Sequence, residues 1–591
     1  MHRLDAAPRL AHFVFIFLFS FVSYGASAQA NLPAVGTRGV AVADPVVPLP
    51  PGVPCSVTLY DNETFDDFSL HDFRYTPPAS CPGPYAKVVL RADFSVTTGR
   101  QFDRTANLWI GAVNLYFGTT QEPSAIDAPA WRIERDISDY ASVLSTPQDG
   151  KIDLGNVVNE TYTGILHGSA QILFFRDTTP NRPDRPRRPD RVLPMSSNAL
   201  GGVTDISGDG EFARAFTLPT NIERVFLDVI AQSQGGDEFW MTCVPDDLSE
   251  SLQSCGHTAF RETLVRIDGE PAGVAAVYPW LYTGAIDPGL WRPIPAPQTL
   301  SFEPWRVDLT PFAAQLNDGR PHTIALSVFN AGERFSMAAN LLLYLDAGRS
   351  RVTGALTQNT LAAAPSPQLD RQVSVNDGVT TATLDLRSRR EHVVSGYVDT
   401  SSGRVSTDIR QELRFSNYQQ FTISDDSYVQ SIRQDTLTDT TTRLTRNGRT
   451  SILRDERHLP LKLDYRYAGL EAGARQTADM DLHFVRAVSA GTQGWPLRTA
   501  NSDSSVVNGG TLLFAANGSV AARERQTGLQ TFVYTDPFGV CYARVLQAAA
   551  GALTRASDGN GCADGTTGLR AFDLFHNYAS AHYGASVQLL P

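Results

Sequence analysis

Two short acidic motifs contain the residues of this chain that are best suited to catalysis. One is GRQFDR at residues 99–104, which contains Asp103, and the other is DEFW at residues 237–240, which contains Glu238. Both motifs put a carboxylate beside aromatic residues in a stretch that we expect to be extended. Two carboxylates that separate parts of the chain supply to one cleft can act as general base and general acid, so the motifs indicate hydrolysis without a metal ion.

The two carboxylates are expected to play different roles. We expect Asp103 to orient or activate water, and Arg104 would favour its ionised form because a nearby cation lowers a carboxylate pKa. Adjacent strand residues point to opposite faces, however, so Arg104 could also face away. Glu238 would stay protonated beside Phe239 and Trp240, since apolar surroundings raise a carboxyl pKa, and would donate a proton. The alternatives are a surface carboxylate for Asp103 and a half-buried partner of an arginine for Glu238.

The segments that carry these motifs have the pattern of an all-β protein. Short apolar runs, such as YAKVVL at 85–90 and AQILFF at 170–175, are separated by Gly, Pro, Asn and Asp, as in sandwiches and jelly rolls. NDG at 376–378 and NG at 447–448 predict hairpins in the C-terminal part. We predict two adjacent jelly-roll or β-sandwich domains followed by a further β-rich C-terminal region.

The composition along the chain gives the expected boundaries. A chain of 591 residues is too long for one core, and about three or four domains are expected at ~150 residues each. The predicted parts are a signal peptide at 1–28, an N-terminal jelly-roll domain at 29–178, a Pro/Arg-rich linker or loop at 179–205, a second jelly-roll domain at 206–350, a linker at 351–371 and a β-rich C-terminal domain at 372–591.

The N-terminus is typical of a secretory signal. Arg3 and Arg9 precede an apolar run at 13–22, and Ala-Ser-Ala at 26–28 provides the small residues that precede a cleavage site. The apolar run is too short for a membrane span. We therefore expect a secreted or periplasmic protein with no membrane contact after signal cleavage.

Six cysteines in an exported chain indicate disulfides, although six cysteines allow 15 pairings. Proximity in the sequence favours the pairs Cys55–Cys81, Cys243–Cys255 and Cys541–Cys562. These spacings are not those of zinc ligands.

Charge and motifs exclude several function classes. The net charge of −12 argues against a nucleic-acid partner, which usually requires a basic stripe. The sequence lacks a nucleophile elbow, a phosphate-binding loop and an HExxH motif. We predict neither a metal site nor a cofactor, and the sequence does not indicate an oligomeric state.

Several motifs together resemble the A-type peptide N-glycosidases, plant and acidic bacterial enzymes that remove N-linked glycans from glycopeptides. The resemblance spans roughly residues 55–346. It rests on the two acidic motifs and on FRE at 260–262, GAIDP at 284–288 and LWRPI at 290–294.

A fainter resemblance links the chain to the F-type peptide N-glycosidase, which is built from two side-by-side jelly rolls. It implies that Asp103 is the principal catalytic aspartate and that Glu238 is the essential glutamate of the second domain. A third acidic residue of the F-type would fall near Gly155-Asn156, where this chain has no carboxylate, and Glu160 is a nearby substitute.

Further residues in or near these motifs are candidates for substrate binding. An indole face packs well on a sugar ring, and a guanidinium can bind hydroxyl or acetamide oxygens. Core packing is the alternative for the tryptophans, and Asp237 would face away from Glu238 in a strand. The candidates are Arg104, Trp109, Glu122, Asn156, Glu160, Asp237, Trp240, Trp291 and Arg292.

The resemblance implies an amidase that hydrolyses the bond between asparagine and the innermost N-acetylglucosamine of N-linked glycopeptides or glycoproteins. It would release the whole glycan, leave aspartate, work at acidic pH and tolerate core α1,3-fucose. Two other functions stay open: a non-catalytic glycan-binding β-sandwich protein, and an endo-β-N-acetylglucosaminidase, which also uses paired carboxylates. The products distinguish them, because the endoglycosidase leaves one sugar on asparagine and the binding protein leaves the glycopeptide intact.

Overall fold

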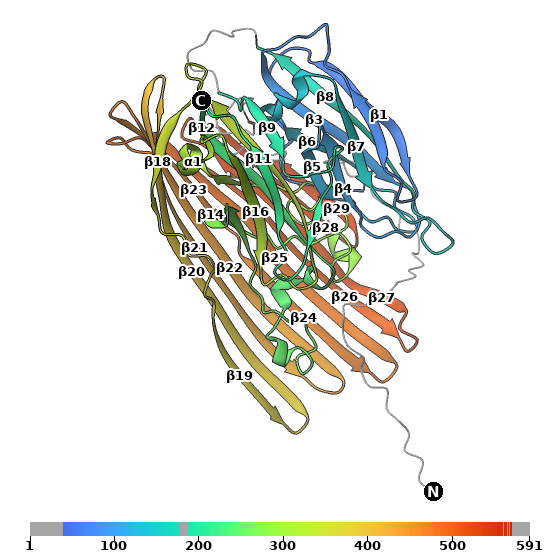
Figure 1. Ribbon diagram of the computed structural model, residues 1–591. Coiled ribbons are helices and arrows are strands. Elements are labelled where there is room, and N and C mark those ends of the chain that lie inside the picture. The colour runs from blue at the N-terminus through green and yellow to red at the C-terminus, as the bar shows by residue number, and fades with distance from the viewer. Residues whose placement is uncertain (1–38, 178–186, 560, 564, 566–567, 570–591) are drawn as a thin grey trace.

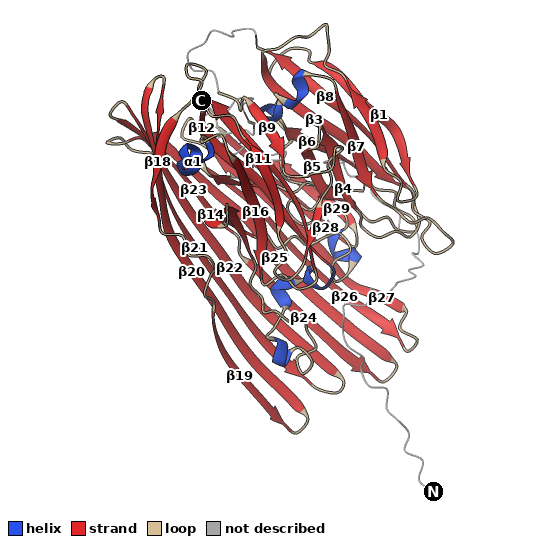
Figure 2. Cartoon of the chain, viewed as in Figure 1, coloured by secondary structure: helices blue, strands red, loops and turns tan. Residues whose placement is uncertain are grey.

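The computed structural model describes residues 39–177, 187–559, 561–563, 565 and 568–569. Most of its regular structure is β-strand, and the short helices lie in the connections (Figure 2). The all-β prediction is therefore confirmed. The predicted signal peptide lies outside the described residues. Within the described ranges, no helix is both long and apolar enough to cross a membrane.

The first part of the chain is a sandwich of two four-stranded antiparallel sheets, in the orders β1-β8-β3-β6 and β2-β7-β4-β5. Every second residue of β3, from Leu90 to Val96, is buried, because a period of two puts these side chains on one face. The strands are β1 (Cys55–Phe65), β2 (His71–Tyr75), β3 (Tyr85–Val96), β4 (Thr105–Ile110), β5 (Val113–Thr119), β6 (Ala130–Asp136), β7 (Gln148–Leu154) and β8 (Leu166–Arg176).

A second sandwich follows, with one sheet in the order β10-β17-β12-β15, to which β9 is added beside β17, and another in the order β11-β16-β13-β14. Its long central strands β12 and β17 are buried along nearly their whole length, since both of their faces are covered. The elements are β9 (Arg191–Pro194), β10 (Thr204–Ile206), β11 (Phe212–Thr217), β12 (Ile222–Gln234), β13 (Glu262–Ile267), β14 (Glu270–Ala276), β15 (Trp305–Asp308), α1 (Ala313–Leu316), β16 (Pro321–Phe329) and β17 (Arg334–Leu345).

The C-terminal region is one 12-stranded antiparallel sheet that lies along the second sandwich (Figure 1). The predicted hairpins are present: Asp377-Gly378 and Asn447-Gly448 have positive φ angles, as a two-residue turn requires. The strands are β18 (Thr353–Asn359), β19 (Gln368–Asn376), β20 (Val379–Thr400), β21 (Gly403–Ile423), β22 (Ser427–Arg446), β23 (Arg449–His458), β24 (Leu461–Leu470), β25 (Gly473–Thr492), β26 (Arg498–Ala515), β27 (Val520–Thr535), β28 (Cys541–Ala549) and β29 (Ala552–Asp558).

Both segments predicted as linkers contain strands. In the described part of 179–205, β9 pairs with β17 and β10 begins, so this stretch extends the second sandwich. In 351–371, β18 pairs with β20 and extends the large sheet. Proline-rich composition predicted loops in both segments, but these strands contain a single proline, Pro194, and the other described prolines lie outside them.

The three parts share apolar cores, so they pack as one body. One cluster joins residues of the second sandwich, such as Phe260, to residues of the large sheet, such as Phe415, and these two rings lie 4.9 Å apart. Another cluster joins Tyr116 of the first sandwich to Leu342 and Tyr344 of the second. The predicted disulfides Cys55–Cys81, Cys243–Cys255 and Cys541–Cys562 are all formed.

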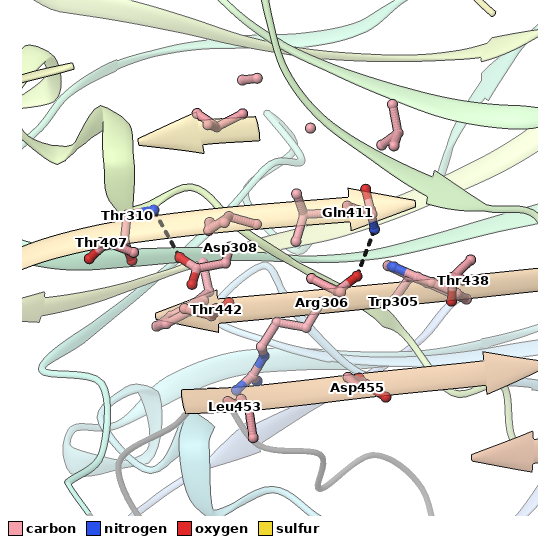
Figure 3. A pocket seen from close by; sticks show the side chains of 18 of the residues that line it. Trp305, Arg306, Asp308, Thr310, Thr407, Gln411, Thr438, Thr442, Leu453 and Asp455 are labelled. Carbon is pink, nitrogen blue, oxygen red and sulfur yellow. Dashed lines mark hydrogen bonds between the residues drawn. The ribbon is translucent and has the colours of Figure 1, made fainter. Parts of the chain in front are cut away.

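A cavity of about 90 Å³ lies between β15 and the inner face of the large sheet (Figure 3). Its wall includes the hydroxyls of Thr407, Thr438 and Thr442 and the carboxyl of Asp308, which accepts a bond from the Thr310 backbone at 2.9 Å. Its lining contains none of the candidate site residues.

Candidate active site

The β4–β5 hairpin brings Asp103 and Glu122 together. Thr105 at the start of β4 is paired with Thr119 at the end of β5, so the residues just outside the hairpin also lie opposite each other. The Asp103 backbone N–H lies 3.3 Å from Glu122 Oε1, and the two carboxyls are hydrogen-bonded. Glu122 was predicted as a substrate contact, and the structure makes it a direct neighbour of the predicted base.

Burial and mutual repulsion keep these two carboxyls at different protonation states. Desolvation raises the pKa of Asp103 to about 6, although Arg104 and the hydrogen bond from Glu122 act against it. Desolvation and the negative charge of Asp103 raise the pKa of Glu122 to about 8. Between these values the pair holds one proton and carries one negative charge, and the two pKa values belong to the pair.

Glu238 joins this pair from the second sandwich. It follows the end of β12 in a turn that begins at Gly235, a residue with positive φ. Burial, and then the charge of Asp103, raise its pKa to about 8. The protonated state predicted for Glu238 is thus supported near neutrality. Glu238 has no ion-pair partner among the residues that the structure describes, so the alternative of a half-buried partner of an arginine is wrong; Arg261 pairs with Asp237 and Arg292 with Glu122.

Neither carboxylate lies on a strand, which corrects the prediction that both segments are extended. Asp103 is in the loop before β4, and Glu238 lies between two short 3₁₀ turns, Gly235–Asp237 and Trp240–Thr242. Asp103 precedes the strand that carries Trp109, so the two residues do not share a strand face. Loops at the ends of strands are a common place for catalytic groups, because the strands hold them rigidly.

Polar side chains join the two sandwiches beside the carboxyls. Gln232 is fully buried, and its Nε2 donates to Thr105 Oγ1 at 3.0 Å, while Gln234 Nε2 donates to the same oxygen at 3.1 Å. The Tyr282 hydroxyl donates to the Ser233 carbonyl at 2.6 Å, and burial together with the charge of Glu238 raises its pKa well above the usual value. These contacts fix the end of β12 against the start of β4.

A segment between β14 and β15 closes the other side of the site. The Gly284 backbone donates a hydrogen bond to the Asp103 carboxylate. A Cβ at Gly284 would lie 2.5 Å from Glu122 Oε1 and 2.7 Å from Asp103 Oδ1, so only glycine permits this approach. Arg292 Nη2 lies 3.7 Å from Glu122 Oε2, which makes Arg292 a partner of the carboxyl pair.

Arg104 lies near the carboxyls and is half-buried. Its charge lowers the pKa of Asp103 as predicted, but the effect of burial is larger, so the net shift is upward. Its guanidinium donates to Gln101 Oε1 at 2.8 Å and lies 5.9 Å from the centre of the Phe102 ring. The Phe102 ring in turn lies 5.2 Å from Tyr162.

The three candidate tryptophans are core residues, so the prediction that they contact sugar is wrong for this structure. Each is at most 1% exposed and therefore offers no open ring face. Trp291 donates to the Ala285 carbonyl at 2.9 Å, Trp240 packs on Phe415, and Trp109 lies against the backbone of Gly201.

Two further candidates have structural roles or lie apart. Asn156 is fully buried, and its amide donates to the Phe65 and Gly164 carbonyls at 3.0 and 3.3 Å, so it holds a loop rather than a substrate. Glu160 is exposed in the turn at 159–162 and, among the described residues, makes no hydrogen bond or ion pair with Asp103 or Glu238. The third carboxyl of the site is Glu122, not Glu160.

Asp237 anchors the turn that carries Glu238. It is 1% exposed and accepts bonds from Arg261 Nη2 at 2.9 Å and from the backbones of Glu333 and Arg334 at 2.7 and 3.0 Å. Asp237 lies in the 3₁₀ turn Gly235–Asp237, so strand alternation does not apply to it, and its contacts make it a support of this turn.

Sequence reasoning missed Gln232, Tyr282 and Gly284 as residues of the site. Gln232 carries a usable signal, because a glutamine inside a strand that is otherwise apolar must find a buried partner. Tyr282 and Gly284 lie in a stretch without strands or repeats, and only the packing of the chain shows what they contact.

Comparisons with known proteins agree with the resemblance. Residues 53–361, just over half of the chain, match the family model described as peptide N-acetyl-beta-D-glucosaminyl asparaginase amidase A. Peptide-N4-(N-acetyl-beta-glucosaminyl)asparagine amidase A of Prunus dulcis is 30% identical over 362 residues, which are 58% of this chain and 62% of that protein. The match thus covers less than two thirds of the almond protein.

Two solved structures are similar to part of the chain. The structure of PNGF-II has a TM-score of 0.33 at 14% identity. The alignment covers 49% of this chain and 65% of the PNGF-II chain. A crystal structure of peptide-N(4)-(N-acetyl-beta-D-glucosaminyl) asparagine amidase has a TM-score of 0.31 at 13% identity. The alignment covers 49% of this chain and 96% of the chain in that structure. The family match over residues 53–361 includes all the carboxyls described above, and the chain belongs to the peptide N-acetyl-beta-D-glucosaminyl asparaginase amidase A family.

Proposed function

We propose that this protein hydrolyses the amide between asparagine and the innermost N-acetylglucosamine of N-linked glycopeptides or glycoproteins, releasing the whole glycan and leaving aspartate. Membership of the family supports the reaction class. The observation that carries the proposal is the convergence of Asp103, Glu122 and Glu238 from two sandwiches, with pKa values raised to different extents.

The reaction divides between the two sandwiches. Asp103 takes a proton from water as the oxygen attacks the carboxamide carbon, so a C–O bond forms. The C–N bond then breaks, and protonated Glu238 supplies the proton that the leaving nitrogen needs. The products are an aspartate side chain and a glycosylamine, which later loses ammonia. General acid–base groups of this kind each contribute typically ~10²–10⁴-fold.

Glu122, Arg292 and Gly284 support the base. The protonated Glu122 carboxyl and the Gly284 N–H both donate to Asp103, and hydrogen bonds to a carboxylate favour its ionised form. Arg292 offsets the negative charge that the pair carries while Asp103 is ionised. These contacts keep a base available although its site is desolvated.

We also propose that activity is highest at mildly acidic pH. Asp103 must be ionised and Glu238 protonated, so kcat/KM falls below about pH 6 and above about pH 8 on the free-enzyme values. These values centre the kcat/KM profile near neutrality, so the proposal of a mildly acidic optimum applies to kcat and rests on the resemblance to acidic bacterial enzymes.

Two finer proposals concern location and substrate range. Export is supported by the N-terminal signal pattern and by three disulfides, which persist in oxidising compartments. Recovery of mature protein beginning after Ala28 in the periplasm or medium would support it, and uncleaved protein in the cytoplasm would contradict it. Tolerance of core α1,3-fucose follows from the resemblance, and failure on a plant-type fucosylated glycopeptide would contradict that.

The test of the main proposal is mass spectrometry of a defined N-glycopeptide incubated in heavy-oxygen water at mildly acidic pH. Release of the whole glycan, with asparagine converted to heavy-labelled aspartate, is the expected result. A peptide that retains one N-acetylglucosamine would show an endoglycosidase instead. An untouched glycopeptide across the pH range, with folded protein, would favour a glycan-binding protein.

A further inference from the structure

The large C-terminal sheet holds the segment that closes the active site. Residues 284–294, here called the closing segment, form no β-strand; their only regular element is the short turn Pro288–Trp291. Their backbone carbonyls therefore need hydrogen-bond donors from other parts of the chain, because buried backbone groups are rarely left unpaired. Side chains of β25, β26 and β27 supply these donors.

Three amide side chains reach five carbonyls of the closing segment. Asn508 donates to Leu290 and Ile294 at 2.7 and 3.2 Å. Gln526 donates to Gly289 and Arg292 at 2.6 and 3.3 Å. Gln476 donates to Ile286 at 3.4 Å. Each contact joins residues almost 200 or more positions apart in the sequence.

Arg523 makes the charged contact of this set. Both of its terminal nitrogens bond the carboxylate of Asp287, Nη2 to Oδ1 at 2.7 Å, and the pair is largely buried, at 12% and 4% exposure. The guanidinium lies directly on Gly289, where any side chain would collide with it. A forked, buried arginine–carboxylate pair fixes orientation as well as distance.

The other side of the closing segment touches the carboxyls. Gly284 donates to Asp103 and Arg292 pairs with Glu122, and just before the segment Thr283 Oγ1 donates to the Thr120 carbonyl at 2.8 Å. The segment therefore has one side on the sheet and the other on the base. A shift of its backbone would remove the contacts that favour ionised Asp103.

We propose that Arg523, Gln526 and Asn508 are positioning residues for the active site, and that the C-terminal sheet sets the ionisation of Asp103 through the closing segment. The proposal rests on the proposed function for its role in catalysis, while the anchoring itself does not require any activity.

The test compares Arg523→Met with Arg525→Met in the full chain. Arg525 lies on the same strand and is a matched control, because its guanidinium pairs with Asp479 at 2.7 Å and donates to the Gly510 carbonyl rather than to the closing segment. In Arg523→Met we expect the acid limb of kcat/KM to move up by about 0.5–1 pH unit, since Asp103 loses hydrogen-bond support. We also expect kcat to fall about 10-fold through misplacement. Arg523→Lys should recover part of both changes, and Arg525→Met should show neither.

Hydrogen exchange measured by mass spectrometry gives a readout that needs no activity. Peptides that cover 282–294 should exchange severalfold faster in Arg523→Met than in the wild type or in Arg525→Met. An unmoved acid limb and unchanged exchange in folded Arg523→Met would overturn the proposal. If Arg523→Met fails to fold, Gln526→Met replaces it in both measurements with the same criteria.

The two proposals fail in different ways. A wild-type protein without glycan release would overturn the proposed function, and exchange in the closing segment would then decide the anchoring alone. A wild-type amidase whose acid limb is the same in all variants would overturn the positioning role and leave the proposed function intact.

Discussion

Three carboxyls with raised pKa values form the centre of this protein at the scale of single residues. Burial is the largest cause in each case, and the charge of Asp103 adds to it at Glu122 and Glu238. The same environment therefore creates a base that is ionised above about pH 6 and two acids that stay protonated up to about pH 8. This separation of roles by environment is how carboxyls act as acid and base at one pH.

Asp103→Asn and Glu238→Gln should each lower kcat by about 10²–10⁴-fold, because each removes one proton transfer. Both changes are nearly isosteric, so thermal unfolding should stay close to that of the wild type. Kinetics with a defined glycopeptide, together with melting curves, checks both statements. A variant that keeps a near-wild-type rate would exclude its residue from the mechanism.

The pH dependence of stability gives an independent test at Glu238. Its pKa rises from a usual 4.5 to about 8 on folding, so the folded protein holds a proton there that the unfolded chain has lost. Stability is therefore lost as the pH rises across this interval. Glu238→Gln removes this contribution, and its melting temperature should fall less between pH 5 and pH 8, by on the order of 1 °C. Parallel curves for variant and wild type would show that the Glu238 pKa is not raised.

At the scale of elements, strand ends place the carboxyls and buried anchors hold the turns. The β4–β5 pairing sets Asp103 against Glu122, and Asp237 fixes the turn that follows β12. The side chains of Asp237 and Arg261 are each 1% exposed, so water cannot solvate the charge of one if the other is removed.

Asp237→Ala should destabilise the protein by about 3–5 kcal/mol, because it leaves the buried Arg261 without its partner. Activity should fall as well, since the turn that carries Glu238 loses its anchor. The matched control is Asp247→Ala, which removes an exposed ion pair with Arg371 and should change stability by less than about 0.5 kcal/mol. Denaturant unfolding measures both, and equal effects would refute a special role for Asp237.

At the scale of the whole molecule, the large sheet completes the core of the second sandwich. Phe415 of β21 lies against Trp240 and Phe260, two of the largest buried residues near the Glu238 turn. The sheet also accounts for most of the described C-terminal region, so its packing face is a major part of the buried apolar surface.

A chain that ends at residue 350 should therefore fail to fold cooperatively, because apolar surface that the sheet covers would be exposed to water. We expect aggregation or a broad melting transition without amidase activity. Calorimetry and near-ultraviolet circular dichroism of the truncated protein test this. A sharp transition with full activity would show that the sandwiches form a stable unit on their own.

The sequence alone predicted those features of this protein that depend on neighbouring residues. Short apolar runs separated by turn residues predicted the strands, NDG and NG predicted hairpins, and proximity predicted all three disulfides. Asp103 and Glu238 were found because short motifs around them resemble a family, and burial supports the protonation expected for Glu238.

Only the tertiary structure decided which side chains are buried and what they contact. Trp109, Trp240 and Trp291 look the same in the sequence whether they bind sugar or fill a core, and long-range packing buried all three. The contacts of Gly284 with Asp103, and of Arg523 with Asp287, join positions far apart in the chain. Local patterns set the backbone conformation of a segment, but solvent exposure and pKa depend on what other segments pack against it, and no local pattern records that.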